Sequence, residues 1–116
     1  MKVMSFQEQE ADVEGPRPGW TRLSLAHAKN FSIAYFYRSA GHSWPQHHHP
    51  SEKVTIIIQG QMKVVCSDGT ECLLKPGDSV YFAPNEKHQI EHAGTEQAIG
   101  IDIFSPARNC DLWMNQ

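Results

Sequence analysis

The chain has 116 residues, of which 40% are hydrophobic and 20% charged, and its formal net charge is −3 with histidine neutral. This length suits one domain that buries a real core without obligatory disulfides. No basic run provides a surface for nucleic acid or for membrane headgroups. Residues 1–15 contain no apolar run, so we expect no secretory signal, and no segment approaches the ~20 apolar residues of a membrane span. We therefore expect a cytoplasmic protein.

Residues 1–19 are polar and end in a Gly-Pro-Arg-Pro-Gly sequence, so we expect a loose N-terminal arm or an edge segment. From residue 20 onward, short apolar runs alternate with turn residues. The runs that we expect to form strands are residues 31–37, 53–60, 61–66, 70–75, 79–83, 87–93 and 97–104. No segment keeps a helical period. This spacing of strands and turns predicts an all-β sandwich or barrel.

The three cysteines, Cys66, Cys72 and Cys110, make an odd count, which predicts free thiols in a chain without a secretory signal. The sequence Asp68-Gly69 is the preferred one for a two-residue hairpin loop. Such a loop places Cys66 and Cys72 on opposite faces of the hairpin, where they cannot form a disulfide.

Two of the expected strands, within residues 53–59 and 98–104, carry apolar side chains on both faces. One face of each strand must line the interior, which leaves a β-branched stripe outside. One parity carries Val54, Ile56, Ile58, Ile99, Ile101 and Ile103, and the other carries Lys53, Thr55, Ile57, Gly100, Asp102 and Phe104. An outer stripe of this kind favours a homodimer through these faces, and cover by the N-terminal arm is the alternative.

Four histidines carry the strongest chemical signal. His47 and His49 alternate along an expected strand, so their imidazoles point to one face, with Cα atoms about 6.6 Å apart. His48 has the opposite parity and points away. His88 joins the first two if the chain folds back as a closed sheet. Three neutral imidazoles suit a first-row divalent ion and leave positions open for water or substrate, whereas the alternative is a surface histidine run with one unrelated histidine.

Two motifs around these histidines resemble those of the cupin superfamily. The first runs from Gly41 through His47-His48-His49 to Gly60. The second runs from the Pro76-Gly77-Asp78 turn through a Pro-containing turn to His88. By this resemblance, residues 20–116 form a single cupin β-barrel of the jelly-roll type.

The same resemblance implies that His47, His49 and His88 are metal ligands. The metal is Ni, Fe, Mn, Zn or Cu, because three imidazoles bind several such ions. At Lys53 the sequence departs from the family, which has a Glu, Gln or His ligand there. The site could have three histidines alone, Glu52 could replace the missing ligand through a bulge, or Lys53 could bind a substrate carboxylate or act as an acid or base. We favour the first or the third arrangement.

The last expected strand ends in Asp102-Ile103-Phe104-Ser105-Pro106-Ala107-Arg108. By parity Asp102 and Phe104 share a face, and a carboxylate inside a barrel needs a partner or a function. The planar guanidinium of Arg108 suits a substrate carboxylate, whereas the alternative is a strand-end aspartate with an exposed arginine.

This ending resembles a subgroup of single-domain cupins from pectin and alginate catabolism that open the ring of 4,5-unsaturated uronates. In that subgroup the positions matching Asp102, Phe104 and Arg108 line the active site. The resemblance implies a metal-dependent isomerase or lyase-type enzyme that acts on a small anionic sugar acid.

In this hypothesis the metal polarises a substrate oxygen and Asp102 shuttles a proton. Arg108 holds the substrate carboxylate together with Lys53, and Phe104 packs on the sugar ring. Two other functions stay open. One is a three-His iron dioxygenase, and the other is a binding or sensor module without turnover.

Overall fold

The computed structural model describes residues 1–5, 20–39, 43–47 and 50–107. Nine β-strands occur in this part of the chain: β1 (Trp20–His27), β2 (Ser32–Arg38), β3 (Ser43–His47), β4 (Glu52–Gln59), β5 (Gln61–Cys66), β6 (Glu71–Leu74), β7 (Ser79–Phe82), β8 (His88–Ala93) and β9 (Ala98–Ser105). The described residues contain no helix, so the all-β prediction is confirmed. Accordingly, none of them belongs to a helix that could cross a membrane.

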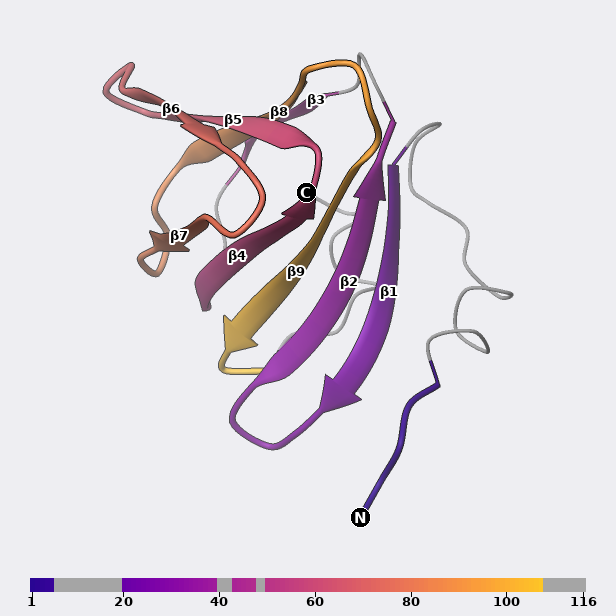
Figure 1. Cartoon of the computed structure of the whole chain (residues 1–116). Helices are drawn as coiled ribbons and strands as arrows, with labels where there is room; N and C mark the ends of the chain where they lie inside the picture. Colours follow the sequence, from indigo (N-terminus) through magenta and orange to yellow (C-terminus); the bar gives the residue numbers. More distant parts are fainter. Residues whose placement is uncertain (6–19, 40–42, 48–49, 108–116) are drawn as a thin grey trace.

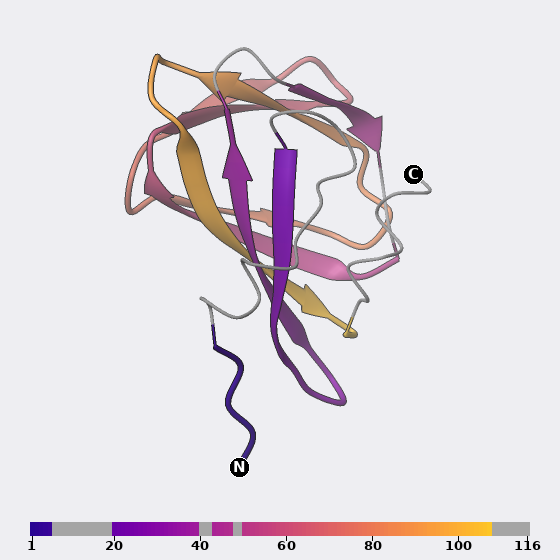
Figure 2. The same ribbon diagram turned by 90° about the vertical axis from the view of Figure 1, so that its right-hand side faces the viewer.

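The strands form two antiparallel sheets. One has the order β1-β2-β9-β4-β7 and the other the order β3-β8-β5-β6. Figures 1 and 2 show the two sheets folded over one another, with the long β1–β2 hairpin reaching beyond the smaller sheet. Apart from the β1–β2 and β5–β6 hairpins, neighbours in each sheet come from distant parts of the chain, and this arrangement is that of a jelly-roll barrel.

The interior contains an apolar part and a polar part, both made by side chains that alternate along the strands. The apolar core consists of Phe36, Ile57, Met62, Val64, Leu74, Phe82, Ile90 and Ala98. The buried polar or charged side chains are Arg22, Ser32, Arg38, Ser51, Lys53, Thr55, His88 and Asp102. Within the apolar core, the Phe36 ring packs directly on Gly100, where a Cβ would lie 2.3 Å from Phe36 Cζ.

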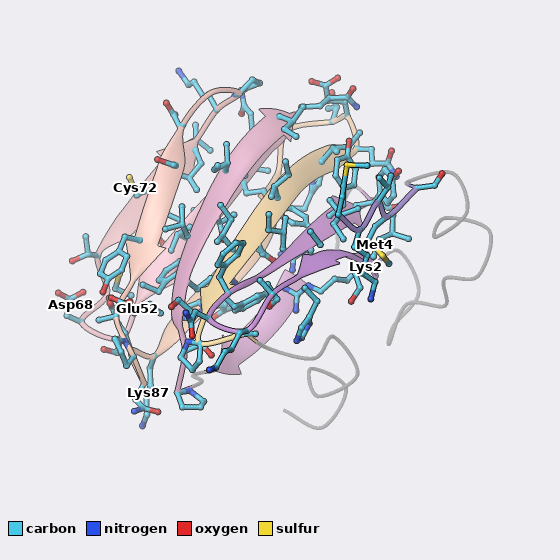
Figure 3. The ribbon with its side chains drawn as sticks, turned by 90° about the horizontal axis from the view of Figure 1, so that it is seen from below. Lys2, Met4, Glu52, Asp68, Cys72 and Lys87 are labelled. Carbon is cyan, nitrogen blue, oxygen red and sulfur yellow. The ribbon has the colours of Figure 1, made fainter. Side chains whose placement is uncertain are left out.

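The outer face of the five-stranded sheet is apolar across several strands. In one row, Tyr35 of β2 lies opposite Ile101 of β9, which lies opposite Ile56 of β4, and all three are half-buried. Leu23 of β1 lies opposite Tyr35 on the same face and is fully buried, so the chain itself covers this face at β1. At β4, Ile58 stays 46% exposed. Figure 3 places Lys2 and Met4 on the side where β1 and β2 lie.

The β5–β6 hairpin differs from the expectation. The Cys66 N–H donates to Thr70 O at 2.9 Å, so the loop has three residues rather than two, and Gly69 takes a φ of +89°. This shift of one residue puts Cys66 and Cys72 on the same face, and the expectation of opposite faces is wrong. Both thiols are free, as predicted, while Cys110 lies outside the described residues.

Candidate functional site

Two adjacent rows of inward side chains bring the predicted residues of β9 and β4 together. Asp102 and Phe104 of β9 both face the interior, each with 2% exposure, as their parity predicts. Asp102 lies opposite Thr55 of β4, and Phe104 lies opposite Lys53. Lys53 in turn lies opposite Phe82 of β7. A carboxylate, an ammonium and two aromatic rings therefore lie together on the inner face of the neighbouring strands β9, β4 and β7.

The Asp102 carboxylate accepts a hydrogen bond at each oxygen. Thr55 Oγ1 donates to Oδ1 at 2.6 Å, and Arg22 Nη2 donates to Oδ2 at 2.7 Å. Burial by itself would raise the pKa of Asp102, but the charges of Lys53 and Arg22 and these two hydrogen bonds lower it below its ordinary value. Asp102 is therefore ionised at neutral pH and can accept a proton.

Lys53 points into the barrel and is 1% exposed. Its Nζ lies 5.4 Å from the centre of the Phe82 ring and 6.0 Å from the centre of the Phe104 ring. The neighbouring Glu52 has the opposite parity, is exposed, and accepts a hydrogen bond from Tyr81 Oη at 2.6 Å (Figure 3). The arrangement in which Glu52 replaces a metal ligand is therefore wrong, because regular strand alternation turns it outward.

His88 of β8 approaches the Phe82 ring from the facing sheet. It is fully buried, and its imidazole stacks on Phe82 with ring centres 3.9 Å apart and an angle of 15° between the planes. Its Nδ1 lies 2.9 Å from Glu86 O. In the neutral ring Nδ1–H donates to this carbonyl, so Nε2 carries the lone pair that metal ions use. The geometry of His88 thus fits a metal-binding histidine.

The other predicted ligands are placed only in part. The backbone register of β3 and β8 puts His47 directly opposite His88. The side chain of His47 and the whole of His49 and Arg108 lie outside what the structure describes. Within the described residues, no three side chains of the metal-binding types come together. The pairing of β3 with β8 therefore places the backbones of two of the three predicted ligands, His47 and His88, side by side.

A family model of the cupin domain matches residues 35–104, which is more than half of the chain. The chain belongs to the cupin family. The comparison with curated proteins finds no match.

Three solved structures illustrate the likeness of this cupin to known proteins. KdgF from Halomonas sp. has a TM-score of 0.84 and 23% identity, covering 97% of this chain and 98% of that one. An RmlC-like cupin from Shewanella frigidimarina has a TM-score of 0.80 and 28% identity, covering 94% and 95%. Ectoine synthase from P. lautus has a TM-score of 0.84 and 18% identity, covering 99% and 85%. The likeness to KdgF and to ectoine synthase concerns the fold.

Sequence reasoning missed three residues of this interior, namely Arg22, Arg38 and Thr55. Arg38 is fully buried and donates from Nη1 to Ile90 O of the facing sheet at 2.7 Å. Burial, together with the charge of Arg22, lowers the pKa of Arg38 to about 8. In sequence these residues resemble ordinary surface positions of strands. The signal that could have found Thr55 is its shared parity with Lys53, two positions before it.

Among the described residues, four side chains of arginine, lysine or aspartate are buried in this interior. Three are cationic, Arg22, Arg38 and Lys53, and the fourth is the Asp102 carboxylate. In a low-dielectric environment such cations attract a small anion more strongly than they would in water.

Proposed function

We propose that this cupin is a metal-dependent enzyme of the isomerase or lyase type that opens the ring of a 4,5-unsaturated uronate monosaccharide. The observation that carries the proposal is the ionised Asp102 carboxylate, held beside Phe104 and the buried cation Lys53. The cations Arg22, Arg38 and Lys53 near this carboxylate suit an anionic sugar. The similarity to KdgF in fold and the Asp102-to-Arg108 ending support the choice of substrate.

The ligands of the metal are His47, His49 and His88 in this proposal. The second ring nitrogen of metal-binding histidines commonly donates to a carbonyl, and His88 has this partner in Glu86 O at 2.9 Å. A bound divalent ion supplies a Lewis acid that polarises a substrate oxygen.

Asp102 acts as a base and accepts the proton of the anomeric hydroxyl as the ring C–O bond breaks. The same proton is then delivered to the carbon at the far end of the former double bond, so the product is a linear isomer of the substrate. Lys53 and Arg108 hold the substrate carboxylate, and Phe104 packs on the sugar ring. Burial of Asp102, Lys53 and Phe104 keeps bulk water away from the reacting atoms.

The test supplies an unsaturated monouronate to the purified, metal-loaded protein and follows the loss of the ring double bond by ultraviolet absorbance. We expect turnover by the wild type and a loss of about 10²–10⁴-fold in Asp102→Asn, the usual contribution of a general base. Lys63→Gln, which changes a half-exposed lysine paired with Glu91 at 3.1 Å, is the control and keeps the wild-type rate.

Unchanged absorbance with the wild-type protein would remove this substrate. Retention of the sugar acid without conversion would then favour a binding or sensor module. Oxygen uptake by the iron-loaded protein with candidate diols or thiols would favour a dioxygenase instead.

We also propose that the cupin is a homodimer that pairs through the outer face of its five-stranded sheet. The support is the apolar row of half-buried residues across β2, β9 and β4, together with the exposed Ile58. The cover of Leu23 within one chain limits the contact to the β9–β4 side of this face.

A further inference from the structure

Arg22 reaches Asp102 across an intervening strand. Arg22 belongs to β1 and Asp102 to β9, and β2 lies between these two strands. In register Arg22 lies opposite Phe36 of β2, whereas Asp102 lies opposite Ala34. Ala34 is inward and 1% exposed, and its side chain is a single methyl group. This small residue leaves the space through which the arginine passes over β2.

The guanidinium contacts both of the β9 residues to which the proposed function gives a role. Arg22 Nη2 lies 2.7 Å from Asp102 Oδ2, and the guanidinium carbon lies 5.6 Å from the centre of the Phe104 ring. Thr55 holds the other Asp102 oxygen from the opposite side, since β4 is the other neighbour of β9. The carboxylate is thus fixed from two directions, and the ring beside it is fixed by the same arginine.

We propose that Arg22 is a positioning residue of this site and acts through Asp102 and Phe104. The small side chain of Ala34 leaves the space that Arg22 needs to reach them. The inference rests on the proposed function and adds a residue to it. Arg22 orients the carboxylate by a directional hydrogen bond and holds the aromatic ring by its planar cationic face. A lysine at this position would supply the charge without the planar geometry.

Three cationic side chains act on Asp102 from the surrounding strands. These are Arg22 from β1, Arg38 from β2 and Lys53 from β4. Arg22 is the cation among them that is hydrogen-bonded to the carboxylate. Its removal leaves the charge of Lys53 and the bond from Thr55 in place, so Asp102 should then take up a proton at a higher pH.

The experiment compares Arg22→Gln, Arg22→Lys and Ala34→Leu with the wild type. The first readout is the titration of the Asp102 carboxyl carbon by ¹³C NMR, assigned with Asp102→Asn. The second is the acidic limb of the pH profile of kcat/KM for the unsaturated monouronate. Lys63→Gln, which removes a cation at the surface, is the matched control and leaves both readouts unchanged.

In Arg22→Gln we expect the pKa of Asp102 to rise by about one unit, a tenfold change in proton affinity, and the acidic limb to move with it. We expect kcat to fall at least about tenfold with little change in KM, because in this proposal Arg22 acts through Asp102 and Phe104 and not on the substrate itself. Arg22→Lys should titrate between Arg22→Gln and the wild type, and it decides the matter if Arg22→Gln does not fold. Ala34→Leu should act in the same direction with the arginine intact.

An unchanged Asp102 titration in the Arg22 variants would overturn the proposal, as would a wild-type titration in Ala34→Leu. The NMR readout needs no substrate. If the wild type fails to convert the uronate while the titrations shift as expected, the proposed function is wrong and the positioning of Asp102 by Arg22 stands.

Discussion

The Thr55→Val substitution removes the shorter of the two hydrogen bonds that hold the Asp102 carboxylate. Thr55 Oγ1 donates to Asp102 Oδ1 at 2.6 Å, and the two side chains are 1% and 2% exposed. Valine has almost the shape of threonine, so the change deletes a hydroxyl without opening a cavity. A hydrogen bond to a charged group contributes about 1.5–3 kcal/mol, and a buried oxygen that loses its donor keeps its desolvation cost. We expect the free energy of unfolding to fall by about 2–3 kcal/mol.

The assay is urea denaturation of the metal-free protein at neutral pH, with the slope of the transition compared between variants. Thr95→Val, at an exposed position in the β8–β9 turn, is the matched control and should change the stability by less than about 0.5 kcal/mol. A loss below this limit in Thr55→Val, with an unchanged slope, would refute the reasoning. It would mean that the Asp102 oxygen is equally well satisfied without the hydroxyl.

The folded-state pKa of Asp102 is lowered, so the contribution of its ionised carboxylate to stability is present above the ordinary carboxyl pKa and is lost as the pH falls below about 4. Chemical denaturation at several pH values should show this loss of stability in the wild type and a smaller loss in Asp102→Asn. Gly100→Ala should destabilise the fold by about 1–3 kcal/mol, because the added Cβ would lie 2.3 Å from Phe36 Cζ and 2.6 Å from Ile56 O; an unchanged denaturation midpoint would show that both the ring and the neighbouring backbone move freely. His88→Ala should reduce the metal content of the purified protein well below that of the wild type in elemental analysis, and equal contents would argue against this ligand. If the proposed dimer forms, Ile101→Lys, in the middle of the outer apolar row, should convert it to a monomer in analytical ultracentrifugation; a monomeric wild type would refute the dimer, and a dimer that survives this charge would place the interface elsewhere.

Strand alternation was the part of the site that could be predicted from the sequence. The parity of Asp102 and Phe104 gave their shared face correctly, because a strand of regular pleat allows no other arrangement. The same rule explains why Lys53 faces inward and Glu52 outward.

Arg22 could not be predicted in this way. Within β1 it alternates with Leu23, and an amphipathic pattern would ordinarily put the leucine inside. The structure reverses this order because the partner of Arg22 is a buried carboxylate 80 positions away in the sequence. Long-range pairing of this kind leaves no local signal.

The register of the β5–β6 hairpin was missed for a different reason. Asp68-Gly69 fits a two-residue loop, and it fits equally well a three-residue loop that ends in a glycine with positive φ. The choice depends on the packing of the flanking strands. Leu74 is buried opposite Met62 in the observed register, and this pairing decides the length of the loop.

The two faces of β9 have a consequence for how the barrel assembles. Ile99, Ile101 and Ile103 form one face, while the other combines alanine, glycine, aspartate and phenylalanine. Because the outward face is the more apolar one, hydrophobic burial alone would not reject a strand that slipped by one position. Such a slip would turn the Asp102 carboxylate to the outer face and leave the buried cations without it, which costs free energy. The buried ionic cluster around Asp102 therefore selects the correct register of β9 during folding. In most sheets the register is specified by apolar side chains.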